Sequence, residues 1–185
     1  WQTDFTQFKV VGWGWYYLCT VLDDFSRYIL AWRLAPTMAA TDVQETLLLA
    51  LEQTGVEQVK VHHSPRRLSD NGPAFIAGAL ADFLKPYDID HIRGRAHHPQ
   101  TQGKIERYHR SMKSIVKLNT FFFPWELEQA IADFVAYYNT VRYHESLDNL
   151  TPADMYFGRH EEVLTRRDIV KQRTFQQRRS HNLRV

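Results

Sequence analysis

Three acidic residues stand at positions where an acidic side chain is unusual, and together they could bind metal ions. Asp4 lies within the alternating segment WQTDFTQF (1–8), which is typical of a β-strand, where Asp is disfavoured. Asp70 stands at a predicted strand-to-helix junction, and Glu106 stands in the first turn of a predicted helix. Carboxylate oxygens are hard ligands that suit Mg²⁺, and two such ions can activate a hydroxyl for attack on a phosphodiester.

Each acid also has an ordinary structural interpretation. Asp4 could be a solvated residue of an edge strand, and Asp70 could cap the following helix or form a turn with Asn71. Glu106 could complement the helix dipole or pair with Arg110, four residues later. For each acid taken singly, both interpretations stay open.

The charges around Glu106 favour the metal-binding interpretation. Between residues 93 and 117 it is the single acid among seven Lys and Arg residues. The predicted helix places this acid opposite an apolar stripe, on one face with three cations: Arg110, Lys113 and Lys117. A carboxylate on such a face would repel a DNA phosphate unless a metal ion lay between them. We therefore expect Glu106 to complete a metal site that faces DNA.

Composition bounds the class of protein. The 185 residues are 44% hydrophobic, which suits one globular domain. The single Cys19 excludes an internal disulfide and suits a reducing cytoplasm, and no apolar run is long enough to span a membrane. Residues 159–185 hold eight Lys/Arg against three Asp/Glu, so we expect a domain over 1–158 followed by a basic extension over 159–185. Because the chain begins at Trp1, we expect an excised piece of a longer protein.

The periodicity predicts a mixed α/β domain. A strand at 1–8 is followed by two more within 15–34, which turn at 23–27 and form an antiparallel meander. Asp23 and Asp24 are expected to serve that turn rather than catalysis. A helix is expected from a capping box of Thr41 and Gln44 to just before Gly55, then a strand within 56–70, a helix from 71–73 toward Pro86 and a strand at 88–94. A helix at 104–119 is expected from its apolar stripe, which consists of Ile105, Tyr108, Met112, Ile115 and Val116. A helix at 124–144 and a short helix, capped by Thr151 and stopping at Gly158, follow. In the tail, a helix is expected around 163–171.

Five segments, in order, resemble the integrase core of bacterial insertion-sequence transposases. They are WQTDFT (1–6), DDFSR (23–27), SDNGPAF (69–75), HPQTQGKIERYH (98–109) and YNTVRYHESLDNLTPADMYFG (138–158). Between Asp70 and Glu106 lie 35 residues, which is similar to the Asp, Asp, 35-residue, Glu signature that these transposases share with retroviral integrases.

The resemblance implies a fold and a chemistry. The fold would be ribonuclease-H-like, a five-stranded mixed sheet flanked by helices. Asp4, Asp70 and Glu106 would be the catalytic acids and would hold two Mg²⁺ or Mn²⁺ ions. Water would attack a phosphodiester at an element end, and the freed 3′ hydroxyl would then attack a target strand.

The resemblance also implies partners. DNA, as element ends and as target, would contact a set of polar and basic residues: Asn71, His98, Gln102, Lys104, Arg107, Arg110, Lys113 and Lys117. A homo-oligomer is expected on DNA, and no membrane partner. An upstream DNA-binding region is expected outside this chain, and the expected location is the bacterial cytoplasm, at the nucleoid.

Two other functions stay open. A ribonuclease-H-like nuclease would cut without joining strands, and a decayed domain would only bind DNA or assemble. The 35-residue spacing and the segment at 98–109 favour the transposase. The histidine pairs at 62–63 and 97–98 lack the Cys partners or helical spacing of a zinc site, so no zinc is expected.

Overall fold

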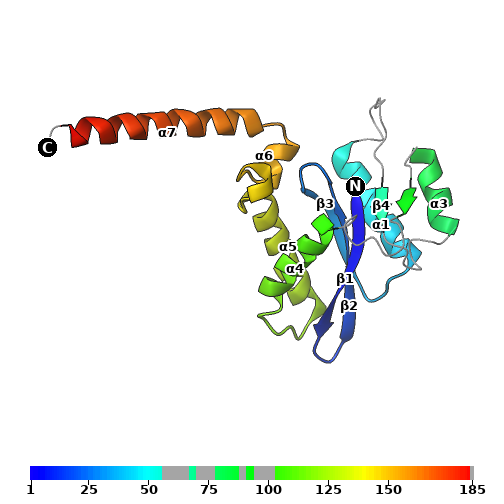
Figure 1. Cartoon of the computed structure of the whole chain (residues 1–185). Coiled ribbons are helices and arrows are strands. Elements are labelled where there is room, and N and C mark those ends of the chain that lie inside the picture. Colours follow the sequence, from blue (N-terminus) through cyan, green and yellow to red (C-terminus); the bar gives the residue numbers. More distant parts are fainter. Residues whose placement is uncertain (56–66, 70–77, 88–90, 94–102, 184–185) are drawn as a thin grey trace.

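A mixed sheet lies between two pairs of helices (Figure 1). The computed structural model describes residues 1–55, 67–69, 78–87, 91–93 and 103–183. Three strands form the predicted antiparallel meander, and two three-residue strands continue the sheet in parallel, in the order β3-β2-β1-β4-β5. The strands are β1 (Gln2–Val10), β2 (Gly14–Leu22), β3 (Ile29–Ala35), β4 (Arg67–Ser69) and β5 (His91–Arg93). The mixed α/β class is confirmed, and most of the sheet is the meander.

Strand β1 is central, with β2 on one side and β4 on the other. Its alternation is the predicted one. Phe8 packs into the core on one face of the sheet, whereas Trp1 and Phe5 pack into the core on the other face. Because β1 pairs with both β2 and β4, the interpretation of Asp4 as an edge-strand residue is wrong.

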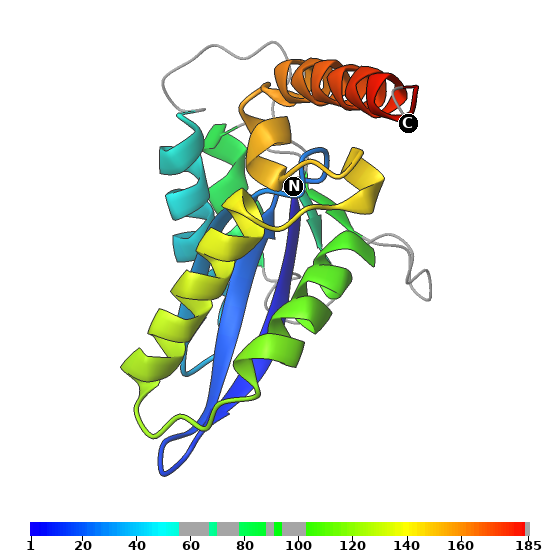
Figure 2. The same ribbon diagram turned by 90° about the vertical axis from the view of Figure 1, so that its left-hand side faces the viewer.

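Helices α4 (Gly103–Val116) and α5 (Pro124–Thr140) cover one face (Figure 2). The apolar stripe of α4 packs on the sheet through Ile105, Tyr108, Met112 and Val116. Ile115, also predicted in that stripe, is 45% exposed because it lies on the flank of the helix. Helix α5 ends at Thr140, before the predicted residue 144, because the chain turns there and His144 forms an isolated antiparallel bridge with Leu150.

The end of α5 protects the sheet edge. Asn139 is buried, and its side chain accepts a hydrogen bond from the Ile29 N–H (2.9 Å) and donates one to the Ile29 carbonyl (3.1 Å). Ile29 begins β3, the outermost strand of the meander. The amide of Asn139 therefore pairs with backbone groups that a neighbouring strand would otherwise have to satisfy.

Helices α1 (Ala40–Thr54) and α3 (Gly78–Leu84), the latter followed by the 3₁₀ turn η2 (Lys85–Tyr87), cover the other face (Figure 1). The predicted capping box of Thr41 and Gln44 is wrong, because the N-cap is Ala39, two residues earlier, and the helix begins at Ala40. Asp42 takes that role: its carboxylate accepts hydrogen bonds from the Ala39 N–H (2.9 Å) and the Thr37 hydroxyl (2.6 Å), and it pairs with Arg33 at 2.7 Å. These tertiary partners decide where the helix starts.

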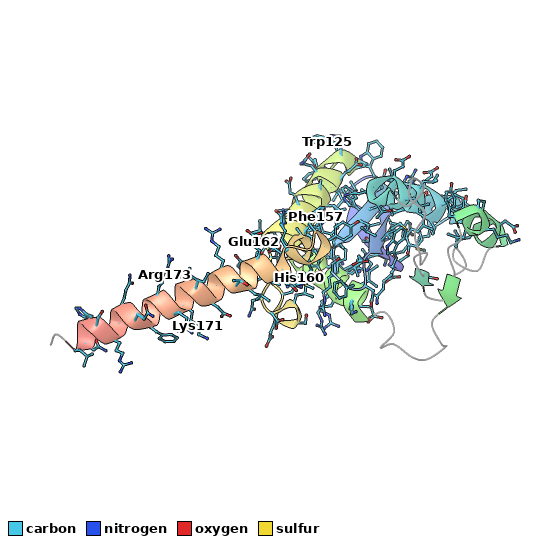
Figure 3. The ribbon with its side chains drawn as sticks, turned by 90° about the horizontal axis from the view of Figure 1, so that it is seen from above. Trp125, Phe157, His160, Glu162, Lys171 and Arg173 are labelled. Carbon is cyan, nitrogen blue, oxygen red and sulfur yellow. The ribbon has the colours of Figure 1, made fainter. Side chains whose placement is uncertain are left out.

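The chain ends in three helical segments: the 3₁₀ turn η4 (Glu145–Leu147), α6 (Pro152–Tyr156) and α7 (His160–Asn182). Thr151 caps α6 as predicted, since its side chain accepts a hydrogen bond from the Asp154 N–H. Helix α7 is longer than the predicted 163–171, buries no residue, and extends away from the sheet, with Lys171 and Arg173 projecting from it (Figure 3). None of the helices in the described ranges is long and apolar enough to cross a bilayer.

Candidate active site

Asp4 is held in place by a buried histidine of α4. The Asp4 side chain is 20% exposed, and one carboxylate oxygen accepts a hydrogen bond from the Phe5 N–H at 2.8 Å. The other oxygen lies 3.4 Å from Nδ1 of His109, whose Nε2 lies 3.5 Å from the hydroxyl of Thr20. His109 therefore connects the acid to the strand beside it. Its role was missed in the sequence, because its spacing on α4 matches the apolar stripe and the contact spans 105 residues.

Gln2 joins the start of β1 to the start of α4. Its side chain is buried, donates to a carboxylate oxygen of Asp24 (2.7 Å) and accepts from the Ile105 N–H (3.0 Å). The amide of Ile105 is one of the helix-start donors that have no partner within the helix. Lys104 closes the arrangement, since its ammonium donates to the carbonyl and the carboxylate of Asp24, both at 2.8 Å. The bond between Ile105 and Gln2 thus joins the chain next to Glu106 to the chain near Asp4.

The acids of the β2–β3 turn serve structure, as predicted. Asp23 accepts hydrogen bonds from the N–H and the hydroxyl of Ser26, and Asp24 is bonded to Gln2 and Lys104. Lys104, which was predicted to contact DNA, lies in the first turn of α4, and its ammonium group is bonded to Asp24 of the β2–β3 turn.

Glu106 is exposed at the start of α4 and makes no hydrogen bond or ion pair with the described residues. The alternative pairing with Arg110 does not form within the described structure, and Arg110 is exposed without a described carboxylate partner. Burial lowers the pKa of Lys113, the nearby charge of Lys117 lowers it further, and the carboxylate of Asp4 opposes both effects. Arg110 and Lys113 therefore share α4 with an acid that has no partner among the described residues.

Four predicted site residues lie outside the described ranges: Asp70, Asn71, His98 and Gln102. Ser69, which precedes Asp70 in the sequence, pairs in parallel register with Thr3, which precedes Asp4. Within the described ranges, no group of three or more His, Cys, Asp and Glu side chains could hold a metal ion. Asp4 and Glu106 nevertheless supply the hard oxygen donors that Mg²⁺ takes, of which it commonly uses one or two from a protein.

The sequence matches the Integrase core domain over residues 1–99 and again over residues 87–152, so the chain belongs to this family. Among curated proteins, it is 32% identical over 113 residues to the Gag-Pol polyprotein of Koala retrovirus and 30% identical over 161 residues to the Pol polyprotein of Radiation murine leukemia virus (strain Kaplan). These alignments cover 61% and 85% of the chain, which spans only 6% and 26% of those polyproteins.

Solved structures that resemble it include integrase and transposase cores. The HTLV-2 integrase catalytic core domain in complex with magnesium aligns with a TM-score of 0.65 at 22% identity, covering 84% of this chain and 93% of that one. The catalytic domain of Mos1 mariner transposase aligns at 0.63 and 21% identity, covering 73% and 68%. This likeness shows the ribonuclease-H-like fold. Family and fold together identify the chain as an integrase core domain built on a ribonuclease-H-like fold.

Proposed function

We propose that the chain is the catalytic core of a DNA transposase that carries out metal-dependent strand cleavage and strand transfer, and that it derives from a bacterial insertion sequence. Membership of the integrase core family supports the chemistry. The observation that carries the proposal is the junction of β1 with α4. Gln2 and His109 join the strand of Asp4 to the helix of Glu106, which leaves the Glu106 carboxylate unpaired among the described residues.

In this proposal Asp4, Asp70 and Glu106 hold the metal. Two bound divalent ions, Mg²⁺ or Mn²⁺, would supply activation of the attacking hydroxyl and stabilisation of the leaving 3′ oxygen. His109 keeps the Asp4 carboxylate oriented, and the Gln2 amide keeps the first turn of α4 against β1. The DNA backbone lies along α4, where the cations contact its phosphates.

We further propose that the enzyme works as an oligomer on DNA. Joining two DNA ends in concert needs two active sites, so at least a dimer is required. Related structures are described as a simian T-cell lymphotropic virus intasome and as a trimeric form of the HTLV-2 core, which supports assembly for this chain too. Recognition of element ends by a separate DNA-binding region, and action at the bacterial nucleoid, belong to the same proposal.

The experiment uses a branched DNA that mimics the joined intermediate, incubated with the chain and Mg²⁺ or Mn²⁺. Wild type is compared with Glu106→Gln, which keeps the size of the side chain and removes its charge. Glu128→Gln is the matched control, because Glu128 is an exposed acid on α5, a different helix. We expect metal-dependent cutting and rejoining in wild type and the control, and a loss of about 100-fold or more in Glu106→Gln, the scale expected when an essential catalytic group is removed.

The other outcomes separate the alternatives. Cutting without rejoined product would indicate a nuclease of the same fold. Equal activity in all three proteins would indicate a contaminating nuclease and would remove Glu106 from the site. If Asp70→Asn leaves every DNA-dependent property intact, the domain only binds or assembles.

A further inference from the structure

Three arginines from distant parts of the chain line one pocket. Arg27 comes from the β2–β3 turn, Arg107 from α4, and Arg142 from the segment after α5. They surround a space of about 490 Å³, whose wall is completed by the segment 143–146. We call this space the arginine pocket. Arg107 follows Glu106 in the first turn of α4, so this turn contributes one residue to the pocket and one to the candidate metal site.

The charges of these arginines are not neutralised within the described structure. None of the three guanidinium groups forms an ion pair with a described carboxylate. Glu145 also lines the pocket but is exposed and makes no such pair with a described residue. Arg142 is placed over the ring of Tyr138, with 6.0 Å from its guanidinium carbon to the ring centroid. Three like charges in one pocket, none of them in an ion pair with the exposed Glu145, repel one another, and an anion bound between them lowers that repulsion.

The combined charge of the arginines affects the pKa values of two neighbouring side chains, His144 and Tyr138. Burial, together with the charges of Arg142, Arg27 and Arg107, lowers the pKa of His144 to about 4. Burial raises the pKa of Tyr138 to about 12, against the effect of the same three arginines. His144 is therefore neutral at pH 7, and its buried Nε2 has no hydrogen-bond partner among the described residues. The positive charge of the pocket comes from groups that stay charged at every physiological pH.

The backbone places Arg27 at some cost. Its φ is +65°, in the left-handed region that residues other than Gly, Asn and Asp rarely adopt. The turn keeps this shape through Asp23, whose carbonyl accepts the Arg27 N–H at 2.8 Å and whose carboxylate holds Ser26. Arginine does not favour this backbone conformation, so the hydrogen bonds of the turn hold Arg27 in place.

We propose that the arginine pocket binds a phosphate of the DNA backbone beside the candidate metal site, an assignment that rests on the proposed function for the identity of the anion. A guanidinium group can donate two parallel hydrogen bonds to the oxygens of one phosphate, and three of them suit a phosphodiester better than any neutral ligand. The strand that passes Glu106 is thereby held on the far side of the first turn of α4. This contact fixes the register of the DNA without reading its bases.

The test measures binding of a fluorescein-labelled 20-base-pair duplex by anisotropy, in EDTA, across a series of salt concentrations. The variant is the double substitution Arg27→Gln with Arg142→Gln. Its control is Lys9→Gln with Lys85→Gln, which removes the same charge from exposed positions that do not line the pocket. We expect the pocket variant to bind about 10-fold more weakly at 0.1 M salt, with a salt slope smaller by about 1, as for one lost phosphate contact. The control should change both by much less.

Each result decides the assignment. Equal losses in the pocket variant and the control would overturn it, because net charge alone would then explain the effect, and so would an unchanged affinity and slope. If the double variant fails to fold, Arg107→Gln replaces it, since Arg107 is exposed on α4. Because EDTA removes metal, this test is independent of catalysis. A wild type that cannot cut branched DNA but needs these arginines for binding would refute the proposed enzyme and leave the phosphate pocket standing.

Discussion

Replacing Gln2 by leucine should loosen the junction that positions the candidate site. The change removes the hydrogen bonds to Asp24 and to the Ile105 N–H while keeping a side chain of similar size. A buried N–H without a partner costs about 1–3 kcal/mol, and the lost bond to a charged acceptor costs about 1 kcal/mol more, so the free energy of unfolding should fall by about 2–4 kcal/mol.

Urea unfolding followed by tryptophan fluorescence measures this loss. With a slope of about 2 kcal/mol per molar urea, the midpoint should fall by about 1–2 M at constant slope. Gln7→Leu is the matched control, because Gln7 is an exposed glutamine on the same strand, and it should shift the midpoint by less than about 0.3 M. A Gln2→Leu protein as stable as this control would refute the inference that the Gln2 amide holds α4 against β1.

Two further stability predictions follow from buried polar groups. Asn139→Leu leaves the N–H and carbonyl of Ile29 without their side-chain partner, so the free energy of unfolding in urea should fall by about 2–4 kcal/mol. Thr140→Ala, at an exposed position, should lower it by less than about 1 kcal/mol. Equal losses in the two variants would contradict the role of Asn139 at the sheet edge. His144 has a folded pKa near 4, below its usual 6.5, so the unfolded chain takes up its proton first and stability is lost as pH falls from 6.5 to 4. Because the imidazole is only half-buried, we expect the free energy of unfolding to fall by about 1 kcal/mol between pH 7 and pH 4.5 for this reason. His144→Asn should remove this pH-dependent loss. The same loss in both proteins would show that His144 does not titrate in this way.

Local patterns predicted the elements well and the contacts between them poorly. The alternation at 1–8 predicted β1 and which residues share a face with Asp4, because a period of two is a property of the strand itself. The capping box at Thr41 failed because Asp42 has partners in β3 and in the loop before the helix, which a local motif does not register.

The site itself shows the same division. Glu106 could be selected as a candidate from its place among cations on one predicted helix, which a sequence displays directly. The contacts of Asp4 with His109 and of Gln2 with Ile105 join residues more than 100 positions apart, and no periodicity reports such a pair. The arginine pocket is hidden for the same reason, since its three arginines belong to three separate elements.

The junction of β1 with α4 also sets an order of events during synthesis. Asp4 leaves the ribosome with the first strand, but Glu106 follows 102 residues later. At about 5–20 residues per second this delay is roughly 5–20 s, during which the nascent chain can form its meander but carries only part of the acid set. Both ends of the junction must be made before Gln2 can bond to Ile105, so a chain interrupted before residue 105 would fold its first strands and yet have no competent site. Under the proposed function, DNA cleavage in the cell would therefore report on chains that extend past Glu106, and products truncated before it would be inert.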